Sequence, residues 1–265
     1  MLLWLVFMLT ACGRGDTSDA SAATSGPTAT PTELAVANIE PKQEDSAMIR
    51  YETLTLQNGT EIEYAIVLPD KFDESQIYPI LLALPPGGQT RDMVDAGLGY
   101  WADGAMAHGW IVLSPTAPNG ELFFMGSEQL IPEFLQLTAA RYKPEGGQYH
   151  LAGISNGGIS AFRIAGLHPQ LFHSIIAAPG YAYSDEDKQM LTRLTNIPIA
   201  LFVGENDTGW VTAMQETTAT INQLGGFAAL EIVPNEGHVI RSLGDGVKLY
   251  GLLESFRVWE SSKSN

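Results

Sequence analysis

A serine lies in a glycine-rich segment that is typical of a catalytic nucleophile. The segment is Gly153-Ile154-Ser155-Asn156-Gly157-Gly158, and it holds the pattern Gly-x-Ser-x-Gly between an expected strand and an expected helix. Glycines beside the serine permit a sharp strand-to-helix turn, because neighbouring backbone can pass without a Cβ clash. Backbone N–H groups at the start of the helix can then stabilise an oxyanion. The pattern predicts Ser155 as a nucleophile, and the alternative is an ordinary serine in a glycine-rich turn.

Two segments further along the chain offer the base and the acid that a serine nucleophile needs. Where this turn occurs in a parallel sheet, an acid and then a histidine follow the serine, each after a later strand. His238 follows the last expected strand and is the predicted base. Asp207 follows the strand before it and is the predicted acid, with Glu205 as the alternative. Glu236 is interpreted as a loop charge, and the remaining histidines as packing or surface residues.

A second glycine-rich loop, residues 84–90, follows the first expected parallel strand. It reads Leu84-Pro85-Pro86-Gly87-Gly88-Gln89-Thr90, and a loop in this place supplies the second oxyanion donor. Proline has no backbone N–H, so Gly87 is the first residue of the pair of glycines that can donate. We therefore expect the N–H groups of Gly87 and Asn156 to form the oxyanion hole. The alternative for the two glycines is a simple turn.

Aromatic residues in three loops are candidates for the wall of a substrate site. Phe123 and Phe124 follow one expected strand, Tyr181 and Tyr183 follow another, and Trp210 lies close to Asp207. The alternative for each of them is packing in the core or within a loop.

Short apolar strands alternate with helices over most of the chain. Asn58-Gly59 separates two alternating runs and indicates a hairpin. The later strands are continuously apolar, which is typical of a parallel sheet covered by helices on both faces. The predicted fold class is therefore α/β, with a mostly parallel eight-stranded sheet, an N-terminal hairpin and no large lid domain. The expected strands cover 51–56, 61–68, 77–84, 110–113, 148–152, 172–178, 198–203 and 228–233, and the expected helices cover 127–141, 156–167, 211–224 and 244–259.

The single cysteine, Cys12, follows an apolar run that is too short to span a bilayer. This run fits the hydrophobic region of a signal peptide, and Leu9-Thr10-Ala11-Cys12 resembles a bacterial lipoprotein signal. The next residues are rich in Ser, Thr and Pro and contain little that could be buried. We expect a signal peptide over 1–11, a lipid-anchored linker over 12–49 and a catalytic domain over 50–265. The alternative is a buried N-terminal helix with an incidental cysteine.

The net charge, the cysteine count and the motifs that the sequence lacks argue against several classes of function. The chain has 265 residues and a net charge of −16, which argues against general nucleic-acid binding because phosphates would be repelled. A lone cysteine excludes an internal disulfide and a cysteine zinc site. The sequence has no phosphate-binding or dinucleotide-binding motif and no metal-ligand cluster, so no cofactor is expected.

These residues resemble the α/β-hydrolase superfamily over Tyr51 to Trp259. Within it, the segments 83–90 and 153–158 are similar to the polyhydroxybutyrate depolymerase and feruloyl esterase group, although Pro85-Pro86 stands where that group has His-Gly. This resemblance implies a serine hydrolase that acts on a small-molecule or polymeric ester. The lipoprotein signal implies that the protein is exported and anchored to a membrane, outside the cytoplasm, through Cys12. A serine peptidase of the same fold and a non-catalytic binding lipoprotein are the alternatives.

Overall fold

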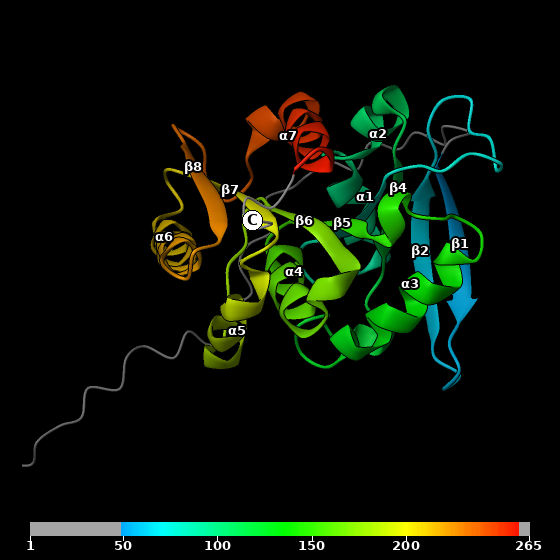
Figure 1. The fold of residues 1–265 in the computed structure, drawn as a ribbon, viewed down its shortest axis with the longest axis horizontal. Helices are drawn as coiled ribbons and strands as arrows, with labels where there is room; N and C mark the ends of the chain where they lie inside the picture. The colour runs from blue at the N-terminus through cyan, green and yellow to red at the C-terminus, as the bar shows by residue number, and fades with distance from the viewer. Residues whose placement is uncertain (1–48, 260–265) are drawn as a thin grey trace, which may run out of the picture. The chain divides into compact units, whose positions relative to one another are not determined.

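Eight strands form one sheet in the computed structural model, which describes residues 49–259 (Figure 1). Their order across the sheet is β1-β2-β4-β3-β5-β6-β7-β8. The strands are β1 (Ile49–Thr55), β2 (Glu61–Val67), β3 (Ile80–Leu84), β4 (Ile111–Pro115), β5 (Tyr149–Gly153), β6 (Phe172–Ala177), β7 (Pro198–Gly204) and β8 (Phe227–Val233). The prediction of a mostly parallel eight-stranded sheet is confirmed.

The hairpin and the parallel part of the sheet follow the patterns of the sequence. β1 and β2 pair antiparallel around the Asn58-Gly59 turn, where Gly59 has a φ of 83°. β2 also pairs antiparallel with β4, whereas β4, β3, β5, β6, β7 and β8 are parallel to one another. The carboxyl ends of the parallel strands therefore lie at one edge of the sheet, where loops can bring side chains together.

The helices differ from the expected ones in number and at their ends. They are α1 (Arg91–Leu98), α2 (Ala102–His108), α3 (Ile131–Ala139), α4 (Asn156–Leu167), α5 (Asp185–Met190), α6 (Thr208–Gln223) and α7 (Val247–Arg257). The sequence patterns did not predict α1 and α2 as separate helices. The helix expected from Ser127 begins as a 3-10 turn, and α3 starts at Ile131 with a proline in its first turn, where a missing N–H is tolerated. α6 starts three residues before the expected position, at Thr208.

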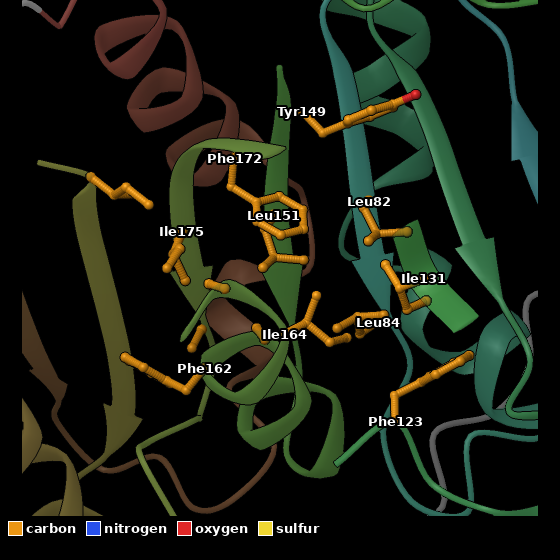
Figure 2. Packing of buried hydrophobic residues seen from close by; sticks show 14 of the residues in the cluster. Leu82, Leu84, Phe123, Ile131, Tyr149, Leu151, Phe162, Ile164, Phe172 and Ile175 are labelled. Carbon is orange, nitrogen blue, oxygen red and sulfur yellow. The ribbon is translucent and has the colours of Figure 1, made fainter. Parts of the chain in front are cut away.

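Alternating side chains of the strands supply two hydrophobic layers, one on each face of the sheet. In β3, Leu82 and Leu84 pack in a cluster with α3, α4 and α6, whereas Leu81 and Ala83 pack in a cluster with α1, α2 and α7. Figure 2 shows part of the first cluster, including Leu82, Leu84, Leu151 and Ile164. The sheet is thus covered on both faces, which explains why its central strands are continuously apolar.

The predicted signal peptide, Cys12 and nearly all of the predicted linker lie outside the described residues. Ile49, the last residue assigned to the linker, is the first residue of β1. Within residues 49–259, no helix has the length and apolar character needed to cross a membrane.

Helices α2 and α7, which pack on the same face of the sheet, meet in one close contact. A Cβ atom on Gly104 of α2 would lie 2.2 Å from Cδ2 of Tyr250 on α7. The Tyr250 ring is fully buried, and its hydroxyl donates a 2.8 Å hydrogen bond to the Trp101 carbonyl. Because this ring cannot move aside easily, the contact requires a residue without a side chain.

We predict that Gly104→Ala lowers the free energy of unfolding by about 1–3 kcal/mol, because the added methyl group overpacks the α2–α7 contact. Urea denaturation measures this change. Gly251→Ala is the matched control, since a Cβ there would meet no heavy atom within 4 Å and alanine favours a helix interior by up to about 1 kcal/mol. Equal midpoints for wild type and Gly104→Ala would contradict the packing argument.

Candidate active site

Ser155 occupies a strained turn between β5 and α4. Its φ of 56° and ψ of −119° fall in a region that residues other than glycine rarely adopt. The turn is held by hydrogen bonds on both sides: the Ser155 N–H donates to the Pro179 carbonyl at 2.8 Å, and the Ile159 N–H donates to the Ser155 carbonyl at 3.0 Å. These bonds place Ser155 at the carboxyl end of β5 and at the N-terminus of α4.

The glycines of the motif allow backbone segments to approach one another. A Cβ atom on Gly157 would lie 2.1 Å from the Leu84 carbonyl oxygen, and one on Gly153 would lie 2.1 Å from the Gly157 carbonyl oxygen. Neither distance is compatible with any other residue type. The two glycines therefore bring the start of α4 against the end of β3, where the Gly87 loop begins.

Three side chains from different loops meet at this edge of the sheet. His238 Nε2 lies 2.8 Å from Ser155 Oγ, and His238 Nδ1 lies 2.6 Å from Asp207 Oδ2. An ionised carboxylate only accepts hydrogen bonds, so Nδ1 carries the imidazole proton and Nε2 is left to accept from the serine hydroxyl. The structure thus brings together the nucleophile, base and acid that the sequence predicted, in an order that permits proton transfer from serine to histidine.

The acid loop and the histidine loop are joined by backbone hydrogen bonds. The Glu205 N–H donates to the Val233 carbonyl and the Asn206 N–H donates to the Glu236 carbonyl, each at 2.9 Å. These bonds extend the β7–β8 pairing past the ends of both strands. Asp207 and His238 are consequently held in register with each other.

The two other carboxylates near the site have different partners. The Glu205 carboxylate accepts from the Asn235 N–H at 3.0 Å. The Glu236 carboxylate accepts from the N–H groups of Arg241 and Ser242 at 3.3 and 3.0 Å. Both side chains therefore organise the loop after β8, and Asp207 is the carboxylate that contacts His238.

Gly87 and Asn156 lie next to each other, as an oxyanion hole would require. The Asn156 side-chain amide donates a 2.8 Å hydrogen bond to the Gly87 carbonyl. Within residues 49–259, neither the Gly87 N–H nor the Asn156 N–H donates to a protein acceptor. Both N–H groups are thus available to a ligand beside Ser155.

Aromatic rings form a continuous row that starts at the histidine. The Trp210 ring meets the His238 ring edge-on at 4.8 Å, and Tyr181 meets Trp210 at 4.9 Å. Tyr183 follows at 6.1 Å from Tyr181, and Phe124 follows at 5.9 Å from Tyr183. Trp210 is 9% exposed and Tyr183 is 37% exposed, so the row runs from the buried site toward solvent. We call these four rings, Phe124, Tyr181, Tyr183 and Trp210, the aromatic row.

One predicted substrate contact is wrong. Phe123 is fully buried in the hydrophobic cluster that contains Leu84 and Ile131 (Figure 2), so its side chain faces the core. The neighbouring Phe124 is half-buried and belongs to the aromatic row. The sequence could not separate the two, because an irregular loop has no periodicity that assigns a side chain to the core or to the surface.

The position of Gln89 was not predicted from the sequence. Its side chain is completely buried and makes hydrogen bonds to Pro85, Phe123 and Ser160. A glutamine in a glycine-rich loop is usually exposed, so its residue type alone did not indicate this position.

The other histidines of β5 and β6 lie elsewhere. Burial lowers the pKa of His150 to about 3, so its ring is neutral, and its Nδ1 lies 2.7 Å from Ser174 Oγ. His173 Nε2 lies 2.7 Å from the Phe256 carbonyl. His150 is buried and His173 is half-buried, and no cluster of three or more metal-ligating side chains occurs within residues 49–259.

Comparison with known proteins identifies the fold. No family model and no curated protein sequence matches the chain. Among solved structures, a thermostable esterase superposes with a TM-score of 0.64 at 19% identity, covering 80% of this chain and 62% of that protein. A ferulic acid esterase superposes with a TM-score of 0.63 at 18% identity, covering 80% of this chain and 98% of that protein. Dipeptidyl peptidase 4 of Porphyromonas gingivalis superposes with a TM-score of 0.59 at 15% identity, covering 79% of this chain but 35% of the peptidase.

These similarities are too low in identity to carry a substrate from one protein to another, but they agree with the strand order and the helical layers. The chain therefore has the α/β-hydrolase fold, which here occurs in both esterases and peptidases.

Proposed function

We propose that this protein is a serine hydrolase that cleaves carboxylic esters through an acyl-enzyme intermediate. The observation that carries the proposal is the pair of contacts Ser155–His238 and His238–Asp207, at 2.8 and 2.6 Å. A hydroxyl, an imidazole and a carboxylate in this order are the components that activate a serine nucleophile.

The reaction begins with proton transfer from Ser155 Oγ to His238 Nε2 as Oγ bonds to the ester carbonyl carbon. Asp207 orients the ring and stabilises the imidazolium that forms. The tetrahedral intermediate then collapses, and the alcohol departs with the proton held by His238. A water molecule then gives one proton to His238 as its oxygen bonds to the acyl carbon. When this second tetrahedral intermediate collapses, the bond to Ser155 Oγ breaks, His238 returns the proton to Oγ and the acid is released.

The negative charge on the carbonyl oxygen requires donors in place before the reaction. The N–H groups of Gly87 and Asn156 are available for this purpose, and the Asn156 side chain fixes Gly87 beside α4. One oxyanion donor typically contributes about 3–4 kcal/mol of transition-state stabilisation.

The aromatic row supports an apolar part in the substrate. Phe124, Tyr181 and Trp210 present ring faces or edges in a series that starts at His238. Burial raises the pKa of Tyr181, so its hydroxyl stays protonated at neutral pH and adds no charge to the row. An acyl or alcohol group that extends from the reacting carbonyl can lie along these rings.

A serine peptidase is the second candidate, because a peptidase is among the solved structures with this fold. The same three side chains serve ester and amide cleavage, so the choice depends on the relative rates for the two substrates. A binding protein without catalysis is the third candidate, and it requires that Ser155 be unreactive.

We also propose that the protein is exported and held on a membrane by lipid attached to Cys12. The support comes from the sequence of residues 1–12 and from the Ser/Thr/Pro-rich segment that follows. The acidic net charge of −16 is consistent with a role that does not involve nucleic acid.

We predict that Ser155→Ala lowers kcat for short-chain p-nitrophenyl esters by at least about 10³-fold, because removal of the nucleophile leaves only binding and the oxyanion hole. The measurement is initial-rate hydrolysis of acetate, butyrate and octanoate esters and of a peptide anilide. Ser174→Ala is the matched control, since this buried serine contacts His150 and not the site. A fluorophosphonate probe followed by peptide mapping should label Ser155.

The outcomes separate the three candidates. Faster turnover of the anilide than of the esters supports the peptidase. Equal rates for wild type and Ser155→Ala on every substrate, or labelling at another residue only, would contradict the proposed nucleophile.

We predict that Phe124→Ala raises KM for p-nitrophenyl octanoate by about 5- to 20-fold and leaves KM for p-nitrophenyl acetate unchanged. Loss of the outer ring removes about 1–2 kcal/mol of apolar contact that only a long group reaches. Steady-state kinetics on an ester series measures the difference. Phe227→Ala is the control, because this exposed ring on β8 contacts Trp259 and is not part of the aromatic row. A uniform change across the series would contradict a substrate-binding role for Phe124.

We predict that Cys12→Ser transfers the protein from the membrane fraction to the soluble fraction of expressing cells. The reason is that the thiol is the proposed site of lipid attachment. Immunoblots of separated fractions and incorporation of a labelled fatty acid measure the change, and Ser155→Ala should remain with the membrane. Fatty-acid labelling that persists in Cys12→Ser would overturn the anchor.

A further inference from the structure

Gln89 is the one residue of the loop 84–90 whose side chain is both polar and completely buried. Its φ is 53°, in the left-handed region that glycine and asparagine usually fill. A residue held in this conformation indicates a local constraint, and here the side chain shows what that constraint is.

The Gln89 amide joins three segments of the chain. Its Nε2 donates to the Pro85 carbonyl at 3.3 Å and to Ser160 Oγ at 3.0 Å, and its Oε1 accepts from the Phe123 N–H at 2.8 Å. Since a backbone N–H only donates, the bond from Phe123 assigns the oxygen and nitrogen of the amide. Both amide hydrogens are used, so the side chain has one defined orientation.

These bonds form part of a closed ring around the proposed oxyanion hole. Ser160 Oγ accepts from Gln89 and donates to the Asn156 carbonyl at 2.8 Å. The Asn156 side chain donates to the Gly87 carbonyl, also at 2.8 Å. Gly87 connects through Gly88 back to Gln89 along the chain. The ring therefore contains both residues whose N–H groups would bind the oxyanion.

The third hydrogen bond of the Gln89 amide connects this ring to the loop that carries Phe124 of the aromatic row. The Phe123 N–H that donates to Gln89 belongs to the residue before Phe124, the outer ring of the aromatic row. A second bond, from the Ala117 N–H to the Gln89 carbonyl at 2.8 Å, holds the other end of the segment 117–123. Gln89 thus contacts the loop 84–90 that contains it, helix α4, which follows Ser155, and the segment 117–123 that precedes Phe124.

We propose that Gln89, with Ser160, is a positioning residue that sets the distance between the two oxyanion donors. It touches no reacting atom. Its effect is transmitted through the ring Gln89–Ser160–Asn156–Gly87, which holds the carbonyls of Gly87 and Asn156 and so positions the backbone of the two residues that bear the N–H donors. The inference rests on the proposed ester hydrolysis, because the oxyanion exists only if Ser155 attacks a carbonyl.

The test compares Gln89→Met, which keeps the length of the side chain without its hydrogen bonds, with Ser160→Ala and with their double variant. Active-site titration with the fluorophosphonate first gives the concentration of functional protein in each sample. Steady-state hydrolysis of p-nitrophenyl butyrate and inhibition by an alkyl trifluoromethyl ketone are then measured. This ketone forms a tetrahedral adduct with serine whose oxyanion needs the same two donors.

We expect kcat per active site to fall about 10- to 100-fold in Gln89→Met and about 3- to 10-fold in Ser160→Ala, with KM changed less than about threefold, because small misplacements of donors affect the transition state. The inhibition constant of the ketone should rise by the factor by which kcat/KM falls. The double variant should be no worse than Gln89→Met, since both changes open the same ring. Ser174→Ala, which removes a different buried hydrogen bond, should leave all three constants unchanged.

Unchanged kcat per active site in Gln89→Met would overturn the positioning role, as would a multiplicative loss in the double variant or a ketone affinity that does not follow kcat/KM. If Gln89→Met does not fold, Ser160→Ala decides by two criteria, its kcat per active site and whether its ketone affinity follows kcat/KM. Failure of the proposed function has a different signature, because the wild-type protein would then cleave no ester faster than Ser155→Ala.

Discussion

The backbone turn at Ser155 is the constraint on which the rest of the site depends. A non-glycine residue at φ 56° and ψ −119° costs about 1–3 kcal/mol, so the surrounding structure must hold it. Three backbone contacts do so, and each permits only glycine: Gly153 against Gly157, Gly157 against Leu84, and Gly158 against Pro179. The turn is thereby fixed against the ends of β3, β5 and β6 at once, and the serine hydroxyl points to where later strands can deliver a histidine.

The position of His238 follows from a second set of backbone contacts. The loops after β7 and β8 continue the sheet pairing for two more hydrogen bonds, which aligns Asp207 with the histidine. α6 begins at Thr208, and Asp207 stands at its N-cap position without using its carboxylate as a cap. The carboxylate is therefore free to accept from His238, and Trp210, on the first turn of the same helix, packs against the imidazole. The start of α6 thus positions both Asp207 and Trp210, which is the ring of the aromatic row that lies next to His238.

The sequence predicted the strands and the three meeting side chains because both depend on local signals. Continuous apolar runs mark parallel strands, and chain order assigns a serine, an acid and a histidine to successive strand ends. Gln89 and Phe123 depend on tertiary contacts instead. A buried amide is stable at Gln89 only because Ser160, Pro85 and Phe123 satisfy it, and none of these partners can be deduced from the loop sequence. α1 and α2 escaped prediction for a related reason, since helices of eight and seven residues are too short to be stable alone and depend on packing against the sheet and, for α2, against α7.

Two parts of the site are held by different kinds of contact. Buried hydrogen bonds and contacts that admit only glycine join the loop 84–90, the turn at Ser155 and α4. Substitutions in these segments therefore disturb several groups together. Phe124, Tyr181 and Tyr183 of the aromatic row contact one another mainly as rings and are half-buried or exposed, so they can change with little effect on the turn. Under the proposed function, catalysis and substrate choice therefore depend on different contacts. This separation gives a physical reason why one sheet architecture can occur both in proteins named as esterases and in a protein named as a peptidase, which share 15–19% identity with this chain.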